Sequence, residues 1–220
     1  MTRAQRVLAG TGFVAGAAVA RHRALRWGAT QVERAVDLPG DGLLVRSDLT
    51  ATRAITVAAP PERIWPWLVQ LGWGRGGFYS YDALENLIGL GIHSAERVEP
   101  QWQDLAVGDQ VHLAPQVGLD VRVLEPGRAL VLAGTAPQGG PAAVPYDFTW
   151  AFVLRPGPEA GTTRLVVRER YLCRTPLARP LVEVVSVLST LMTERMLRGV
   201  CDRAERSAWR RRPARHSVGR

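Results

Sequence analysis

The spacing of hydrophobic and polar positions divides the chain into a strand, two short helices, several further strands and a long final helix. Residues 51–58 are rich in Thr, Ile and Val, which predicts the first strand. Pro60 and Pro61 then predict the start of a helix, because proline is tolerated in a first helical turn. Pro66 lies inside this helix and is expected to kink it or to displace its start. A second short helix is predicted next, with Asp82 in its first turn.

Past the second helix, the helical spacing gives way to short alternating segments separated by turn residues. The segments predicted as strands are 107–113, 118–124, 129–133, 147–154 and 163–173. Consecutive short strands of this kind predict an antiparallel meander. Alternation in the last segment separates two faces, and the face expected to point inward contains Leu165, Val167, Glu169, Tyr171 and Cys173.

The last element begins at Pro176 and is predicted to be a helix of about 30 residues, near 45 Å long at about 1.5 Å per residue. Its apolar residues recur at helical spacing: Leu177, Leu181, Val184, Leu188, Met192 and Met196. Polar residues are predicted to lie away from this stripe, among them Glu183, Ser186, Thr190 and Glu194. We therefore expect the stripe to pack along the concave face of the sheet. A cavity between sheet and helix would suit an apolar ligand.

Three segments carry a resemblance to a known family: ATRAITVAAPPERIWPWLVQLG (51–72), GWGRGGFYSYDALENL (72–87) and GIHSAERV (91–98). They are similar to the START-like, polyketide-cyclase-like superfamily called SRPBCC, and the second segment is similar to a bacterial subgroup of it. The resemblance implies an α+β helix-grip fold. In this fold a curved antiparallel sheet of about six or seven strands surrounds a long C-terminal helix, with two short helices after the first strand. Members carry lipids or hydrophobic small molecules, or catalyse cyclisations, and no agreed catalytic residue transfers to this chain.

The glycines of the second segment do not predict a nucleotide site. Gly72, Gly74 and Gly77 match GxGxxG, but a dinucleotide fingerprint needs these glycines directly after a strand. Here they follow a predicted helix, so we interpret them as a tight turn between two helices. The chain contains no Lys and no GxxxxGK[ST] motif, so a P-loop lysine is excluded. We expect no cofactor.

The candidate ligand-binding residues are polar or aromatic side chains of the glycine-rich loop and of the predicted inner faces: Arg75, Tyr79, Tyr81, Asp82, Glu85, His93, Trp150 and Glu169. Asp82 and Glu85 share one helix face, and either do acid–base work or cap backbone and face solvent. His93 is suited to proton transfer near neutral pH, or is a packed or capping residue. Glu169 needs a partner or a raised pKa among apolar neighbours. It either pairs with an inward arginine, for which Arg75 is the candidate, or the inner face ends before Glu169. Catalytic residues are not assigned.

The net charge of +8 is located at the two ends of the chain. Residues 1–26 carry five Arg and no acidic residue, and residues 203–220 carry seven Arg and one Glu. The intervening body has a net charge of −3, so we do not expect nucleic-acid binding. The basic ends either contact an anionic membrane or remain solvated.

The chain is expected to divide into an N-terminal arm (1–26), an irregular lead-in (27–50), the main domain (51–207) and a basic disordered tail (208–220). Within the arm, the uncharged run 7–20 is shorter than the ~20 residues needed to span a bilayer. A weak membrane anchor, a helical or disordered arm and a cleaved signal peptide all stay open for it. We expect a cytoplasmic protein, with membrane association through the arm.

Cysteine and histidine usage adds little chemistry. Cys173 and Cys201 are far apart, which favours free thiols in a reducing compartment and leaves one disulfide open. No paired Cys/His spacing occurs, so we expect no metal site.

Three functions remain under comparison. We expect a module that binds a hydrophobic or amphipathic small molecule, lipid-like or polyketide-like, in the predicted cavity. The alternative is a cyclase, dehydratase or hydrolase that uses Glu169, His93 or Asp82 as acid or base. A scaffold with a filled core is the third, and a cavity on the order of several hundred Å³ would argue against it. The sequence leaves the oligomeric state open.

Overall fold

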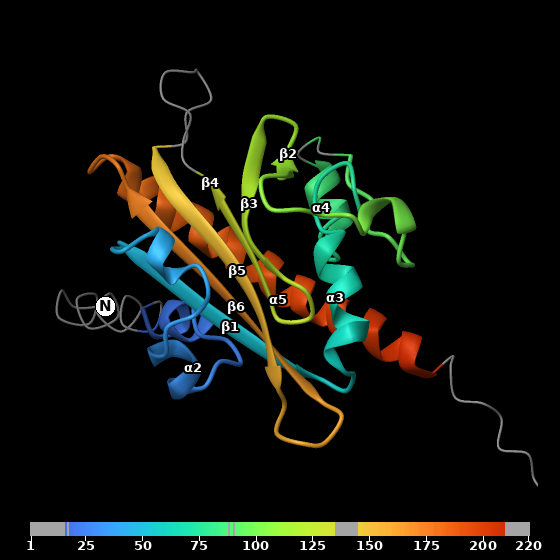
Figure 1. The fold of residues 1–220 in the computed structure, drawn as a ribbon. Coiled ribbons are helices and arrows are strands. Elements are labelled where there is room, and N and C mark those ends of the chain that lie inside the picture. The colour runs from blue at the N-terminus through green and yellow to red at the C-terminus, as the bar shows by residue number, and fades with distance from the viewer. Residues whose placement is uncertain (1–15, 17, 88, 90, 135–144, 210–220) are drawn as a thin grey trace, which may run out of the picture.

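A curved antiparallel sheet with one long helix against it makes up most of the structure (Figure 1). The computed structural model describes residues 16, 18–87, 89, 91–134 and 145–209, without the side chains of residues 84, 85 and 207–209. The strands of this described part are β1 (Leu49–Val57), β2 (Gln110–Ala114), β3 (Val117–Glu125), β4 (Ala129–Gly134), β5 (Tyr146–Pro156) and β6 (Thr163–Cys173). Each corresponds to a predicted strand, so the meander is confirmed.

The first strand of the sheet pairs with the last. The strand order is β1-β6-β5-β4-β3-β2, and every neighbouring pair is antiparallel. The chain between β1 and β2 therefore crosses from one edge of the sheet to the other. Helices α3 (Pro61–Val69) and α4 (Asp82–Leu87) lie in this crossing. The result is the α+β helix-grip fold that was predicted, with six strands in the described residues and two short helices after the first strand.

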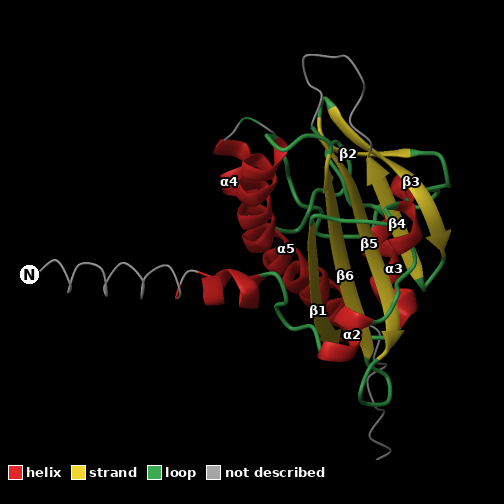
Figure 2. Cartoon of the chain, turned by 90° about the vertical axis from the view of Figure 1, so that its left-hand side faces the viewer, coloured by secondary structure: helices red, strands yellow, loops and turns green. Residues whose placement is uncertain are grey.

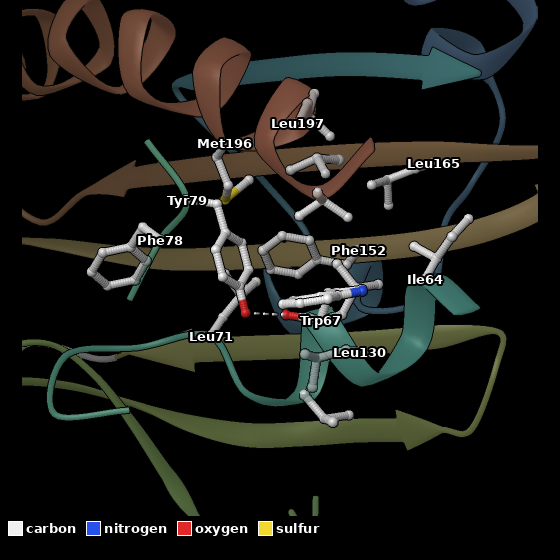
Figure 3. Packing of buried hydrophobic residues seen from close by; sticks show 14 of the residues in the cluster. Ile64, Trp67, Leu71, Phe78, Tyr79, Leu130, Phe152, Leu165, Met196 and Leu197 are labelled. Atoms are coloured by element: carbon white, nitrogen blue, oxygen red, sulfur yellow. Dashed lines mark hydrogen bonds between the residues drawn. The ribbon is translucent and has the colours of Figure 1, made fainter. Parts of the chain in front are cut away.

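Helix α3 begins where the two prolines predict it. Pro61 occupies the first helical position, where the helix does not need its missing N–H, and Pro60 precedes it in an extended conformation. Pro66 lies within α3 and does not displace its start. Its buried residues are Ile64, Trp67, Leu68 and Val69. Figure 3 shows how Ile64 and Trp67 join the apolar core between the sheet and the long helix.

The long helix α5 (Ala178–Trp209) is 32 residues long and packs against β1, β6 and α3 (Figure 2). Its second half confirms the predicted inward stripe, because Met196 is buried in the main core. The prediction for its first half is wrong. Four members of the stripe are exposed: Leu177, Leu181, Val184 and Leu188. Ser186, which was predicted to lie away from the sheet, is buried, and its hydroxyl donates to the carbonyl of Glu183. It belongs to the hydroxyl-bearing side of α5, whose neighbouring residues meet a buried ion pair described below.

The lead-in differs from the irregular segment that was predicted. It contains α2 (Gln31–Ala35), which begins with a capping box between Thr30 and Glu33. A short 3-10 helix, η1 (Asp41–Leu43), follows. The lead-in lies over the outer face of the sheet, where Arg164 pairs with Glu33 and Arg168 pairs with Asp41. Arginines on the outward face of β6 therefore hold the lead-in. The pattern Thr30-x-x-Glu33 was a readable signal for α2 in the sequence.

Candidate functional site

A cavity of about 220 Å³ lies between the sheet and α5. Its walls come from β2, β5 and β6, from the first half and middle of α5, and from the segments on either side of α4. The lining residues are Phe78, Ser80, Ile92, Leu113, Tyr146, Phe148, Trp150, Glu169, Tyr171, Val185, Ser189, Met192, Thr193 and Met196. Most of these side chains are apolar or aromatic, so the cavity suits a largely apolar guest.

An aromatic wall forms one side of the cavity. Tyr146, Phe148 and Trp150 alternate along β5 and therefore share one face of the sheet. The ring centroids of Phe148 and Tyr171 are 4.7 Å apart, and those of Tyr146 and Tyr171 are 5.6 Å apart. Among the described residues, the buried indole N–H of Trp150 has no hydrogen-bond partner. Rings at these distances support one another, which keeps the wall rigid.

Glu169 is the buried charge of the site. It points inward from β6, as alternation predicts, and pairs with Arg53 of β1 at 2.8 Å from Nη1 to Oε1. The two side chains are 2% and 0% exposed. The proposed partner Arg75 is wrong, because its guanidinium donates to the backbone carbonyls of Val69 and Trp102 instead. Burial lowers the pKa of Arg75.

Hydroxyl groups complete the surroundings of Glu169. Thr193 donates to Oε1 at 2.7 Å, while Ser189 and Tyr171 donate to Oε2 at 2.5 and 3.0 Å. Together with Arg53 these groups make four donors, and a carboxylate has about four acceptor positions, so those positions are filled. Burial and the adjacent carboxylate raise the pKa of Tyr171 well above its ordinary value, so its phenol stays protonated and donates.

The partners of Arg53 explain the orientation of α5. Besides Glu169, this guanidinium donates to Thr190 Oγ1 at 2.7 Å and to the carbonyl of Ala24 at 3.2 Å. A buried ion pair is costly unless its remaining hydrogen-bond positions are filled. The first half of α5 supplies those partners from Ser189, Thr190 and Thr193 and therefore turns its hydroxyl residues toward the sheet.

The glycine-rich loop forms the tight turn that was predicted between two helices. Gly72 and Gly77 exchange two backbone hydrogen bonds of 3.1 Å, and both have positive φ, which glycine adopts readily. Gly199 of α5 lets the loop approach closely, since a Cβ there would lie 2.2 Å from the carbonyl oxygen of Tyr79. The turn brings Phe78 and Ser80 into the cavity wall.

Tyr79 and Asp82 stabilise the loop and do not line the cavity. Tyr79 has a positive φ of 55° and donates from its buried hydroxyl to the carbonyl of Trp67 at 3.1 Å (Figure 3). Burial raises the pKa of this phenol well above its ordinary value. The Asp82 carboxylate accepts from the Ser94 N–H at 2.7 Å and from its hydroxyl at 2.6 Å. The Ser94 hydroxyl oxygen also accepts from the Tyr79 N–H at 2.9 Å, so Ser94 links Tyr79 to Asp82.

The remaining candidates are not brought together at the cavity. Tyr81 and His93 are exposed, and neither lines the cavity. The side chain of Glu85 lies outside the described part of the structure. Of the residues singled out in the sequence, Trp150 and Glu169 are on the cavity wall.

Sequence reasoning missed Arg53 and the hydroxyl residues of α5. A signal for Arg53 existed, because alternation along β1 places it on the same face as Ala51 and Ile55. An arginine at an inward position of a strand needs an acidic partner. No comparable signal marked Ser189 or Thr193, since polar residues of a helix ordinarily face solvent.

The described residues contain two free cysteines, Cys173 and Cys201, and no cluster of three or more possible metal ligands. Burial and the neighbouring Glu205 raise the pKa of Cys201 to about 12, which makes this thiol a poor nucleophile. In the same part of the chain, no helix is long and apolar enough to cross a membrane.

Comparisons with known proteins give similarity to solved structures. No family model matches the chain, and a search of curated proteins finds no match. The Polyketide_cyc-like protein Cgl2372 from Corynebacterium glutamicum is 15% identical, with a TM-score of 0.42 over 80% of this chain and 99% of that one. Protein MLL2253 from Mesorhizobium loti is 17% identical, with a TM-score of 0.43 over 72% of this chain and 98% of that one.

A third similar structure is DynU16, a protein of the dynemicin biosynthetic locus. It is 13% identical, with a TM-score of 0.37 over 69% of this chain and 46% of that one. These similarities concern the fold.

Proposed function

We propose that the protein binds a compact, largely apolar molecule in the cavity between the sheet and α5. The main support for this proposal is the cavity, which has a volume of about 220 Å³ and is lined mostly by aromatic and aliphatic side chains. Pockets for drug-sized ligands usually measure about 300–1,000 Å³. The smaller volume favours a ring system or a short chain over a long acyl chain.

The polar groups of the cavity support binding ahead of catalysis. Glu169 already accepts from an arginine and three hydroxyls, so little acceptor capacity remains for a substrate proton. The other two acid–base candidates are engaged elsewhere or exposed, because Asp82 holds Ser94 and His93 faces solvent. The three groups therefore do not converge on one guest.

The unpaired donor of Trp150 favours a guest that carries an acceptor atom. A buried N–H without a partner costs free energy, and an oxygen of the guest would remove that cost after a small adjustment of the ring. We therefore assign the ligand class as an aromatic or alicyclic molecule with at least one hydroxyl or carbonyl oxygen.

Binding of 2-naphthol, followed by its fluorescence, tests this proposal. Val185→Phe places a larger side chain in the cavity wall, and Val187→Phe makes the same change on the exposed side of α5. We expect Val185→Phe to weaken binding at least about tenfold and Val187→Phe to leave it unchanged. Equal binding by the two variants would contradict the proposal.

Trp150→Phe tests the acceptor requirement. Removing the indole N–H should weaken the binding of 2-naphthol more than that of naphthalene, because only 2-naphthol carries an oxygen. Native mass spectrometry of the protein purified from its own host then identifies the natural guest. A chemically altered guest after incubation would favour the enzyme instead.

A further inference from the structure

The outer side of the first half of α5 is an exposed apolar surface. Six aliphatic side chains form it: Leu177, Leu181, Val184, Val187, Leu188 and Leu191. This outer ridge is about 20 Å long at about 1.5 Å per residue. It ends where Arg195 and Arg198 begin the charged outer face of the second half. Isolated exposed aliphatic residues are common on proteins, whereas a contiguous ridge of this kind marks an interaction surface.

Among the described residues, the N-terminal segment lies next to the outer ridge. Residues 18–24 are helical, and Figure 2 shows them extending on the side of the sheet where α5 lies. Two contacts fix their position: Arg21 pairs with Glu183, and Leu25 packs in one cluster with Val182. The described residues 18–25 therefore lie beside the start of the outer ridge.

Charge decides which partner suits this surface. Residues 18–26 carry three Arg and no acidic residue, and Arg179, 71% exposed at the start of α5, pairs with Asp48 at 3.4 Å. In a two-fold dimer through the outer ridge, each copy would bring this same positive charge to the other, which is unfavourable. An anionic lipid surface instead attracts arginines and accepts aliphatic side chains.

We propose that the outer ridge, flanked by the arginines of residues 18–26, docks the protein on an anionic membrane surface. The outer ridge supplies the apolar contact, and these arginines supply the attraction to anionic headgroups. The proposal does not depend on what the cavity binds.

Co-sedimentation of the full chain with lipid vesicles tests the proposal. The vesicles contain phosphatidylcholine alone or mixed with phosphatidylglycerol. The ridge variant combines Val184→Asp with Val187→Asp, at positions 68% and 55% exposed. The control combines Val32→Asp with Val45→Asp, at positions 72% and 86% exposed in the lead-in on the other side of the sheet. Both variants change the net charge equally. A difference in vesicle binding between them therefore reports the contact made by the outer ridge and not the overall charge of the protein.

We expect the wild type to bind the anionic vesicles and to bind phosphatidylcholine alone at least about tenfold more weakly. The ridge variant should lose at least about tenfold in binding to the anionic vesicles, and the control about twofold or less. Circular dichroism checks that both variants remain folded. Equal binding by the two variants would overturn the role of the outer ridge. A wild-type dimer that fails to bind vesicles and becomes monomeric in the ridge variant would overturn the proposal in favour of a second copy.

Discussion

The two halves of α5 face the same sheet with opposite distributions of polarity. In the first half, hydroxyl residues such as Ser189 and Thr193 point inward, and aliphatic residues such as Leu191 are exposed. In the second half the ordinary arrangement holds, with Leu197 buried and Arg198 outside. The difference follows from what the sheet presents, because the first half meets an ion pair and the second half meets an apolar core.

This comparison shows that a helix is oriented by its partner rather than by its own apolar stripe. The buried pair of Arg53 and Glu169 needs hydrogen-bond partners, and the first half of α5 supplies them from its hydroxyl face. The first half of α5 therefore leaves the outer ridge exposed to solvent or to a partner surface.

Removing the charge of Glu169 should have the largest effect. In Glu169→Gln, the guanidinium of Arg53 stays buried without its counter-charge, so we expect a loss of about 3–5 kcal/mol in the free energy of unfolding. Urea denaturation measures it. The double variant with Arg53→Met should recover part of the loss, since both charges are then gone. If Glu169→Gln unfolds at the same urea concentration as the wild type, the buried ion pair does not stabilise the packing of the first half of α5.

Truncation of a buried leucine probes the second half. Leu197 is fully buried, and Leu197→Ala should cost about 3 kcal/mol through the lost apolar contacts and the cavity left behind. The same urea titration gives the value. A cost below about 1 kcal/mol would show that the second half is not the apolar anchor of α5.

Loss of one hydroxyl donor should have an intermediate effect. Thr193→Val keeps the shape of the side chain and removes its hydrogen bond to Glu169 Oε1, which we expect to cost about 1.5 kcal/mol. Thr175→Val makes the same change at an exposed position and serves as the control. If the two variants unfold at the same urea concentration, Thr193 is not a needed partner of the carboxylate.

Truncation on the outer ridge should have the smallest effect. Leu191 is 56% exposed, and Leu191→Ala should change the free energy of unfolding by no more than about 0.5 kcal/mol. Leu191→Ala and Leu197→Ala together compare the loss in the free energy of unfolding for the same substitution on the exposed and the buried side of α5. A cost similar to that of Leu197→Ala would mean that the outer ridge is covered in solution.

Local patterns predicted most of the fold and a part of the site. Alternation along β5 and β6 identified Trp150 and Glu169 as inward residues, because strand periodicity depends only on neighbouring positions. The same rule applied to β1 would have found Arg53. Periodicity could not assign the partner of Glu169, because Arg53 is 116 residues away along the chain and Arg75 was an equally available cation.

The sequence by itself determined where the strands and the helices α3, α4 and α5 lie, the tight turn at the glycine-rich loop and the location of the positive charge at the chain ends. These depend on neighbouring residues, whose spacing and backbone preferences are local. Only the tertiary structure decided which face of α5 points inward, which arginine pairs with Glu169 and how much space remains for a guest. Those features depend on contacts between distant segments, because the hydroxyl face of α5 meets a buried ion pair whose two residues come from β1 and β6.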